Sequence, residues 1–366
     1  MSKVLILSNF GMGLYKFRKE LLKELIDQGH NVYVSLPDDD YIPLLKSMGC
    51  NYIESNLDRR GKNPISDIRL MLSYIRMIHN IKPDIVLTYT IKPNIYGGMA
   101  CRFTNTPYLP NITGLGTAIE NQGMMQKLTL SLYKMGLKKA DSVFFQNKSN
   151  KEFFCEKEIL KSAPIVIPGS GVNLEEHQIE EYPLEDNTIR LLYIGRIMKN
   201  KGIDELLDAS RRFKDNNKLE FHIVGFCEEN YLKELEELDD EGVIHYHGQQ
   251  NDVHKFIKDA HATILPSYHE GLSNVLLESA SAGRPVLASN VDGCKETFDE
   301  GISGFGFDVK STESLVETIK TFINLPYEKK KDMGAAGRKK IETEFDRNIV
   351  IQSYLKQIKI TKENVK

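Results

Sequence analysis

Short apolar runs alternate with amphipathic helical segments along this chain, and the alternation occurs in two series. The first series opens with a strand pattern over residues 3–8, a helical pattern over about 14–28 and a second strand pattern over 31–36. A polar, acidic stretch interrupts the pattern at 175–188, and the alternation restarts with the strand pattern of 189–194. Strand–helix–strand order requires crossover connections, which give parallel sheets. The sequence therefore predicts an α/β fold with two halves, each built on a parallel sheet.

The length of the chain, 366 residues, suits two domains better than a single core. We expect a first domain over 1–174, a linker or hinge over 175–188, a second domain over 189–344, and a final helix over 345–366 that packs back on the first domain. The two domains are expected to face each other across a cleft. Ligands of such folds bind at the carboxyl ends of the parallel strands, so we expect the functional site there.

The composition argues against several classes of protein. The net charge of −3 argues against a general nucleic-acid binder. The five cysteines have no paired spacing, which fits a reducing cytosol and neither a disulfide framework nor a cysteine zinc site. The apolar run at the start is too short for a signal peptide, and no run of about 18 apolar residues could span a membrane. The sequence therefore predicts a cytoplasmic protein.

The most informative local pattern is a strand, a small-residue turn and a helix over residues 262–282. The apolar run 262–266 predicts a buried strand, and 274–282 predicts a helix whose unpaired N–H groups and positive end would attract an anion. Glu270 follows the strand, and Glu278 lies about two helical turns further on, near the same face. The two carboxylates could accept hydrogen bonds from sugar hydroxyls on either side of a diphosphate. The alternative is that both are ordinary solvated glutamates.

Two cations stand near the start of the second half. Arg196 follows the strand pattern of 189–194 through Gly195, and Lys201 lies in the loop after it. A nucleoside diphosphate carries about two or three negative charges, which Arg196 and Lys201 would balance through hydrogen bonds of ~1.5–3 kcal/mol each. An arginine at a strand end also often forms a surface salt bridge. The lysine in the same loop and the helix N-terminus in the same half favour the anion site.

Two other patterns suggest a metal ion. Adjacent carboxylates at Asp38–Asp40 could hold a divalent ion, but they precede a short helical pattern, so helix capping is favoured. His245 and His247 alternate along one predicted strand. A metal site would need further ligands nearby, and the sequence shows none, so half-buried strand histidines are favoured. We therefore expect no metal site.

Basic side chains gather on two predicted helical regions. Along residues 58–82 they are Arg59, Arg60, Lys62, Arg69, Arg76 and Lys82. Residues 124–139 combine methionines and leucines with lysines. A basic amphipathic helix can lie on anionic lipid, or its charged side can be an ordinary solvated face. Peripheral contact with an anionic membrane is the expectation if these helices face lipid.

Together these motifs resemble the family-4 retaining glycosyltransferases of GT-B architecture, over nearly the whole chain. In the second half the resemblance rests on Gly195-Arg196, Lys201-Gly202, Val224-Gly225, Glu270 with Glu278, and Gly283-Arg-Pro-Val286. The first half is similar to the branch that adds N-acetylhexosamines or related sugars to polyprenyl-diphosphate-linked glycans in bacterial capsule, O-antigen and protein-glycan assembly. Its motifs are Phe17-Arg18, Lys82–Val86, Lys92–Gly97 and Ile112–Gly116. The resemblance implies two Rossmann-like domains facing across a cleft.

The resemblance also implies roles for individual residues. Arg196 and Lys201 would bind the donor diphosphate and stabilise the departing UDP. Glu270 would hold hydroxyls of the donor sugar, and Glu278 would hold those of the ribose. Further donor contacts are implied at Gly195 and, through backbone N–H groups, at Gly11, Gly13, Leu272, Ser273 and Asn274.

Two positions depart from the family pattern. After Val224-Gly225, the second glycine that is often found in relatives is absent. Many relatives carry a histidine near the reacting carbon where this chain has Asn111-Ile-Thr113. Asn111 or Thr113 would therefore supply the hydrogen bond at that place, or nothing does.

The predicted activity is transfer of an N-acetylhexosamine or related hexose from a UDP-sugar to a hydroxyl of a polyprenyl-diphosphate-linked glycan, with retention at the anomeric carbon. Because side chains supply the cations, no metal and no cofactor are expected. No carboxylate is placed as a nucleophile, which favours front-face attack with the leaving phosphate taking the acceptor's proton. The enzyme would act in the cytoplasm, at the inner face of the cell membrane. A UDP-sugar 2-epimerase of the same fold and a non-catalytic nucleotide-sugar sensor are the alternatives.

Overall fold

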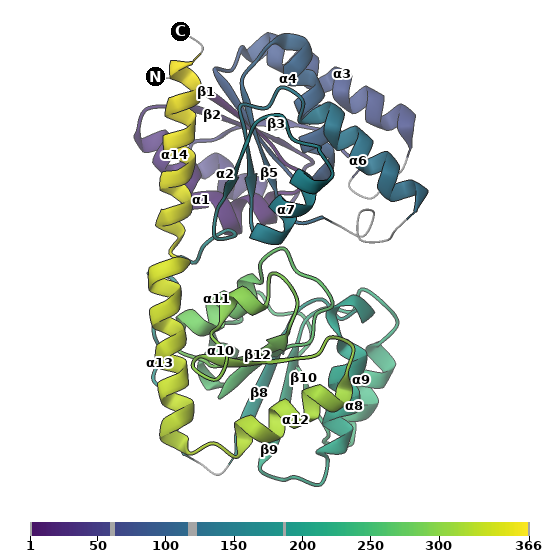
Figure 1. The fold of residues 1–366 in the computed structure, drawn as a ribbon, viewed down its shortest axis with the longest axis vertical. Coiled ribbons are helices and arrows are strands. Elements are labelled where there is room, and N and C mark those ends of the chain that lie inside the picture. Colours follow the sequence, from purple (N-terminus) through teal and green to yellow (C-terminus); the bar gives the residue numbers. More distant parts are fainter. Residues whose placement is uncertain (1, 59–62, 116–122, 186–187, 365–366) are drawn as a thin grey trace. The chain divides into compact units, whose positions relative to one another are not determined.

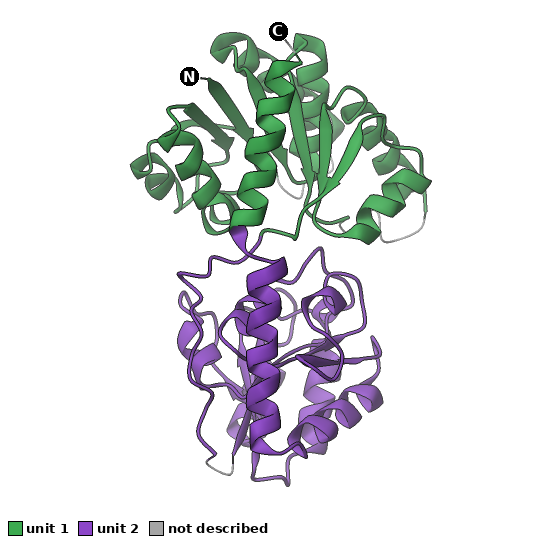
Figure 2. Cartoon of the chain, turned by 60° about the vertical axis from the view of Figure 1, so that its left-hand side comes forward, with its two compact units in different colours: residues 1–170, 348–366 green, residues 171–347 purple. Residues whose placement is uncertain are grey.

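The computed structural model of the chain forms two compact units (Figures 1 and 2). Unit 1 consists of residues 1–170 and 348–366, and unit 2 of residues 171–347. The chain therefore passes from one unit to the other twice. Within these units the structure describes residues 2–58, 63–115, 123–185 and 188–364.

Unit 1 is built on a seven-stranded sheet in which neighbouring strands are parallel. The order across the sheet is β3-β2-β1-β4-β5-β6-β7. Its inner strands are almost continuously apolar and buried, because helices cover a parallel sheet on both faces. The strands are β1 (Lys3–Leu7), β2 (Asn31–Leu36), β3 (Asn51–Glu54), β4 (Ile85–Tyr89), β5 (Tyr108–Ile112), β6 (Ser142–Phe145) and β7 (Ala163–Val166).

Helices cover both faces of this sheet (Figure 1). They are α1 (Gly11–Asp27), α2 (Ile42–Ser47), α3 (Pro64–Ile81), the short helix η1 (Pro93–Gly97), α4 (Gly98–Thr104), α6 (Met124–Gly136), α7 (Lys148–Glu156) and α14 (Arg347–Glu363). α1, α2 and α14 pack on one face through side chains such as Leu21, Leu45 and Val350. α3, α4, α6 and α7 pack on the other face, around Tyr74 and Tyr133. Each helix is thus amphipathic with respect to this sheet.

The last helix, α14, completes the core of unit 1. Val350, Tyr354 and Ile358 recur at intervals of four residues and are buried. The Tyr354 ring lies 4.3 Å from the Phe144 ring, centroid to centroid. Its hydroxyl accepts a hydrogen bond from the Asn111 side-chain amide. The final segment of the chain is therefore part of unit 1.

Unit 2 is built on a six-stranded parallel sheet with the order β10-β9-β8-β11-β12-β13. Its strands are β8 (Ile189–Ile194), β9 (Leu219–Val224), β10 (His245–Tyr246), β11 (Ala262–Leu265), β12 (Val286–Ser289) and β13 (Gly304–Phe307). Its longer helices are α8 (Ile203–Arg212), α9 (Leu232–Asp240), α10 (His254–Asp259), α11 (Asn274–Ser281), α12 (Thr312–Ile323) and α13 (Tyr327–Glu344), with short helices η2 (Lys199–Lys201) and η3 (Lys295–Thr297). Leu191 and Tyr193 of β8 face the main core, and Leu192 and Ile194 face the α10 side.

In each sheet the strand order reverses at one place, between β1 and β4 in unit 1 and between β8 and β11 in unit 2. The connections leave the sheet in opposite directions on either side of such a switch point, which opens a crevice outside the carboxyl ends of the strands. The loops that follow β8 and β11 contain Lys201 and Glu270. The fold alone therefore directs attention to these loops.

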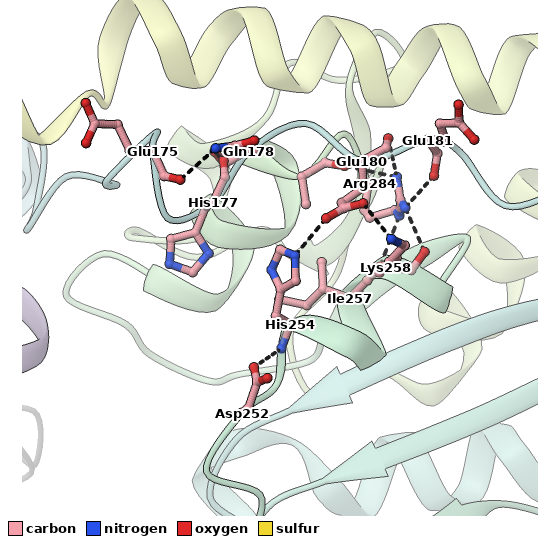
Figure 3. A network of polar contacts seen from close by, with 12 residues as sticks. Glu175, His177, Gln178, Glu180, Glu181, Asp252, His254, Ile257, Lys258 and Arg284 are labelled. Carbon is pink, nitrogen blue, oxygen red and sulfur yellow. Dashed lines mark hydrogen bonds and ion pairs between the residues drawn. The ribbon is translucent and has the colours of Figure 1, made fainter.

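The stretch 175–188, which the sequence analysis expects to be a linker, is packed on unit 2 over the described residues 175–185. Figure 3 shows the reason: the fully buried Arg284 donates to the carbonyls of Glu180 and Glu181 at 3.2 and 2.7 Å. The Glu180 carboxylate in turn lies 2.7 Å from His254 Nε2. Backbone carbonyls leave no signal in a sequence, so the polar composition concealed this contact.

Candidate active site

Lys201 and Glu270 meet at the switch point of unit 2. Lys201 Nζ lies 2.5 Å from Glu270 Oε1, and the two side chains are only 18% and 15% exposed. Ser267 Oγ donates to the same carboxylate oxygen at 2.8 Å. The loops after β8 and β11 are thus joined by a partly buried ion pair. A partly buried pair of this kind can give its hydrogen bonds to a polar ligand without a large change of structure.

Two glycines allow the loops to come this close. Gly202 has φ +72°, and a Cβ atom there would lie 2.0 Å from the Pro266 carbonyl oxygen. Gly293 has φ +82°, and a Cβ atom there would lie 2.6 Å from the Glu270 carbonyl oxygen. A side chain at either position would push the loops apart, in addition to the strain of a positive φ. The positions of Lys201 and Glu270 are therefore fixed by the backbone around them.

The N-terminus of α11 lies directly after this pair. Ser273 caps the helix, since its Oγ accepts the Leu276 N–H at 3.4 Å. The Ser273 N–H itself donates to the Gly293 carbonyl at 2.8 Å, and the Leu272 side chain is buried in the core. The first N–H groups of the helix, from Asn274 on, precede any intrahelical acceptor. Of the three residues expected to meet phosphate oxygens, Ser273 thus has its N–H engaged within the protein, and Asn274 opens the helix.

Arg196 lies at the carboxyl end of β8, next to Gly195, whose N–H donates to the Val224 carbonyl at 3.0 Å. Arg196 Nη1 is 2.6 Å from Glu228 Oε2, and the Arg196 side chain is 46% exposed. The structure thus pairs Arg196 with Glu228, a partner that no sequence pattern indicated. Both expected cations are at the right sheet edge, and each is neutralised by a carboxylate.

Glu278 is carried by α11, and its Oε1 lies 4.0 Å from His177 Nε2. His177 belongs to the stretch expected as a linker, and no sequence pattern marked it. The interval from Glu270 to Glu278 consists of the loop up to Ser273 and just over one turn of α11, whereas about two helical turns were expected. Glu278 remains a predicted ribose contact.

A buried cysteine, Cys294, lies beside this site. Cys294 is buried, and this burial raises the pKa of its thiol well above the usual value; the Glu270 carboxylate acts in the same direction and Lys201 opposes it. A protonated thiol is a weak nucleophile. Burial therefore disfavours Cys294 as a nucleophile.

In unit 1, the expected phosphate contact at Gly11 is occupied by a side chain. The Gly11 N–H donates to Asp39 Oδ2 at 2.5 Å, and the Tyr41 N–H donates to Asp39 Oδ1 at 3.0 Å. Asp39 thus caps α1 as well as the turn before α2, which agrees with the capping interpretation of the acidic cluster. The space around Gly13 is filled by the Phe10 ring, 2.5 Å from a Cβ position. In this structure a carboxylate therefore holds the place at the α1 N-terminus where a phosphate was expected.

The side-chain amide nitrogen of Asn111 has a structural role, and a ligand contact by this residue stays a prediction. Its side chain is fully buried and donates to the Tyr354 hydroxyl of α14, because β5 ends under that helix. The Asn111 carbonyl accepts a hydrogen bond from Asn94 at 2.8 Å. Thr113 lies after β5 and is partly exposed, so it is the better placed of the two for a ligand.

A buried cation, Arg18, lies close to Thr113. Arg18 is carried by α1, is 4% exposed and stands 5.2 Å from the centre of the Tyr89 ring. With its amide oriented to satisfy both groups, Gln146 accepts from Arg18 Nη2 at 3.2 Å and donates to the Thr113 carbonyl at 3.3 Å. The sequence marked Arg18 only as part of the motif Phe17-Arg18. The structure places its charge near the carboxyl ends of β4 to β6.

The structure also changes the interpretation of two histidines. His245 and His247 were expected to lack further metal ligands, but β9 brings Glu220 and His222 beside them. Burial is the largest cause that lowers the pKa of His222 and of His247, so the neutral imidazoles predominate near pH 7. The sequence could not reveal this cluster because the pairing register of β9 and β10 was unknown.

Two helices of unit 1 expose apolar side chains. On α6 the most exposed are Met124 (88%) and Leu128 (54%), and on α3 they are Ile65 (62%) and Ile68 (54%). The basic residues Arg59, Arg60 and Lys62, and Gly116 of the glycine turn, lie outside the described residues. Among the helices of the described chain, none has the length and apolar character to cross a bilayer.

Comparison with solved structures defines the class of protein. The chain superposes on the Anabaena protein HepE, solved with UDP and glucose, with a TM-score of 0.80 and 17% identity over 98% of this chain and 100% of that one. The shared architecture, two units that are each built on a parallel sheet, is the GT-B fold.

The family follows from the sequence comparisons. Residues 3–147 match the family described as glycosyl transferase 4-like, and residues 175–340 match glycosyl transferases group 1. The two matches cover both halves of the chain, which therefore belongs to the glycosyltransferases that these two descriptions name. It is 28% identical to the N,N'-diacetylbacillosaminyl-diphospho-undecaprenol alpha-1,3-N-acetylgalactosaminyltransferase of Campylobacter jejuni, over 96% of both chains. It is 26% identical to the capsular polysaccharide biosynthesis glycosyltransferase CapM of Staphylococcus aureus, over 78% of this chain and 79% of that one. The predicted family is confirmed, and the epimerase alternative has no support among these relatives.

Proposed function

We propose that this glycosyltransferase moves an N-acetylhexosamine or related hexose from a UDP-sugar to a hydroxyl of a polyprenyl-diphosphate-linked glycan, with retention, in bacterial surface polysaccharide synthesis. The proposal is carried by the similarity to the Campylobacter enzyme along 96% of both chains, together with the Lys201–Glu270 pair at the switch point of unit 2. The first observation suggests the substrates, and the second suggests where the diphosphate of the donor binds.

Donor binding must rearrange the charges of the site. Lys201 and Arg196 are each paired with a carboxylate, so the four side chains sum to zero charge. A diphosphate gains attraction only if the carboxylates turn to other partners. Glu270 has such partners in the hydroxyls of the donor sugar, which are hydrogen-bond donors. Binding of the complete sugar nucleotide therefore frees Lys201 for the phosphates, whereas UDP alone does not satisfy Glu270.

The chemistry then depends on the leaving group. The bond from the anomeric carbon to the phosphate oxygen breaks, the acceptor oxygen attacks from the same face, and its proton passes to the leaving phosphate oxygen. Negative charge grows on the diphosphate during this step, so fixed cations stabilise the transition state more than the ground state. Lys201 and Arg196 supply this stabilisation, and the proposal needs no metal or cofactor.

The acceptor is anchored in a membrane, and unit 1 offers a surface for it. Met124, Leu128 and Met135 lie along one exposed stripe of α6, flanked by Lys127 and Lys134. An apolar stripe with lysines along one side suits the boundary between acyl chains and anionic headgroups. We place the enzyme at the inner face of the cell membrane through this helix. The stripe supports this placement because water is an unfavourable neighbour for such side chains.

The test is a transfer assay with a panel of UDP-sugars and a polyprenyl-diphosphate-linked acceptor in vesicles. Lys201→Ala should lower kcat by ~10²–10³-fold, the usual effect of losing one charge-stabilising group, with the folded state intact by circular dichroism. Lys199→Ala is the matched control, because Lys199 lies two residues away and its side chain is 66% exposed. Glu270→Gln should bind UDP more tightly than the parent chain and transfer sugar more slowly, because Lys201 loses its neutralising partner.

Each part of the proposal can fail separately. Unchanged turnover in Lys201→Ala would remove this lysine from the mechanism, and an epimerised nucleotide sugar formed without acceptor would replace the transferase by an isomerase. The membrane part fails if the protein stays in the supernatant with anionic vesicles at low salt. It also fails if a Leu128→Glu variant sediments with them as well as the parent chain does.

A further inference from the structure

A cross-strand cluster of histidines lies at one edge of the unit 2 sheet. β10 is the edge strand and pairs with β9 in parallel, with His245 opposite His222. Alternate residues of a strand share one face, so Glu220 precedes His222 on that face and His247 follows His245. Four side chains that can bind metal therefore share one face of the two strands, with His222 opposite His245 and with Glu220 and His247 at the two ends of the cluster.

The distances within this cluster approach those of a metal site. Glu220 Oε2 lies 3.2 Å from His222 Nε2, and one ligand atom each from Glu220, His222 and His245 lies within 4.8 Å of the others. Ligands of a tetrahedral zinc ion, at about 2.0–2.1 Å from the metal, are about 3.3 Å apart. The glutamate and the first histidine already have this separation. Closing the set requires only a side-chain movement of His245.

We propose that Glu220, His222 and His245 bind a divalent transition-metal ion of the zinc class, with water at the fourth position. Imidazole and carboxylate ligands together suit zinc, whereas magnesium and calcium prefer sites made of oxygen alone. The site is on the sheet face beside α10, whereas the Lys201–Glu270 pair lies in the loops that follow β8 and β11. A metal here is therefore not part of the diphosphate chemistry.

His247 supports the site as a hydrogen-bond partner of His222. Its Nε2 lies 3.0 Å from His222 Nδ1. If His222 binds the metal through Nε2, its Nδ1–H points at His247 and donates to it. A metal-binding histidine usually donates its second N–H to a neighbouring acceptor, which fixes the tautomer and the direction of the ring. The His222–His247 contact has this geometry.

The surroundings provide access and set an upper limit on affinity. A cavity of about 430 Å³ adjoins the cluster and is lined by Arg190, His222, His247, Phe256 and other residues of β8 and α10. Arg190 Nε is bonded to the Asp259 carbonyl at 2.8 Å, which holds it in place near His222. The positive charge of Arg190 repels a metal cation, and the single carboxylate of Glu220 neutralises only one of the two charges of a divalent ion. The site is therefore expected to bind more weakly than a structural site of four cysteines.

Metal binding would stabilise the weakest part of the sheet. β10 has two residues, and a two-residue edge strand has little pairing of its own. The strand continues into a turn whose Gly248 carbonyl accepts the Gly225 N–H at 2.9 Å, at the carboxyl end of β9. A metal that links β9 to β10 therefore also holds this turn. The expected effect is a rise in the thermal stability of unit 2.

The experiment uses the full chain, without a polyhistidine tag and stripped of metal by a chelator. Zn²⁺ is titrated by calorimetry, and Co²⁺ serves as a spectroscopic probe of the coordination geometry. We expect one ion per chain and a higher melting temperature with Zn²⁺. His222→Gln and His245→Gln should each abolish that ion, and His247→Gln should weaken it about 10–100-fold, the usual effect of losing an outer-shell partner. His79→Gln, at the exposed end of α3, is the matched control and should bind as the parent chain does.

Two results would overturn the inference. One is a parent chain that binds no stoichiometric Zn²⁺, a result that does not depend on any variant folding. The other is binding that survives in His222→Gln and His245→Gln but is lost in Cys155→Ser, since Cys155 is an exposed thiol. Transfer activity is expected to persist without added metal, so the metal site and the proposed transferase mechanism are tested independently.

Discussion

Replacement of Arg284 tests whether the stretch 175–185 belongs to unit 2 energetically. The five N–H donors of Arg284 bond to five backbone carbonyls, at 2.7–3.2 Å. The carbonyls of Ile257 and Ala282 also accept a backbone N–H, from Ala260 and Glu180. Those of Glu180, Glu181 and Lys258 receive their described hydrogen bond from the arginine alone. Arg284→Met therefore leaves three carbonyls without a donor.

The magnitude follows from two opposing effects. The three carbonyls are partly buried, so the loss of a donor costs each of them up to ~1–3 kcal/mol and all three together up to ~3–9 kcal/mol. Methionine also removes the desolvation penalty of a buried cation, several kcal/mol, which is the penalty that lowers the pKa of Arg284. The difference predicts a loss of about 3 kcal/mol in the stability of unit 2. Arg284→Lys should be no milder, because the ammonium keeps the charge but has only three donors.

Hydrogen exchange read by mass spectrometry is the assay, because it reports each unit separately and the chain has no tryptophan. The peptide covering 175–185 should exchange faster in Arg284→Met, and peptides of unit 1 should be unchanged. Arg211→Met is the control, since that arginine is 43% exposed and pairs with Glu234 at the surface. A change of less than ~1 kcal/mol in the stability of unit 2 in Arg284→Met, or normal exchange in Arg284→Lys, would refute this role of Arg284.

Two further predictions concern the loops and the pH dependence. Gly202→Ala should destabilise unit 2 and lower the rate of transfer by at least ~10-fold, because the new Cβ atom would collide with the Pro266 carbonyl. Gly242→Ala is the control, since Gly242 has a similar φ of +70° but open space around it. It should lose only about 1–2 kcal/mol to backbone strain. Equal stability losses in the two variants would show that loop contact is unimportant. The His254 hydrogen bond, aided by Lys258, lowers the pKa of Glu180 below its ordinary value of 4.5. This stabilisation is complete above that value and disappears as the pH falls through the folded-state pKa, so Glu180→Gln should flatten the acid limb of a stability–pH curve, and an unchanged limb would contradict it.

The sequence was sufficient for what depends on local pattern. Apolar runs of strand length between amphipathic helices predicted the parallel sheets. The position of a residue just after a strand predicted its place at the sheet edge, which is why Lys201 and Glu270 were expected at one site. Neighbouring parallel strands end at the same edge, so this inference needs no knowledge of distances.

What the sequence could not give depends on contacts between distant residues. Asp39 caps a helix that begins 28 residues before it, and Asn111 bonds to Tyr354 across 243 residues. Arg284 recognises carbonyl groups, which every residue possesses. The partners of Arg196 and of the strand histidines depend on loop conformation and strand register. In each case the sequence shows the side chain, but no sequence pattern predicts which residue it contacts.

The return of the chain to unit 1 through α14 has a consequence for synthesis. Domains usually form as they leave the ribosome, with the earlier one first. Here the earlier unit lacks Val350, Tyr354 and Ile358 until the whole of unit 2 has been translated, and Asn111 has no hydroxyl to bond. The contiguous unit 2 can complete itself beforehand. Unit 2 is thus expected to fold before unit 1 is complete, and the part of the unit 1 sheet that α14 covers stays exposed until that helix has been translated.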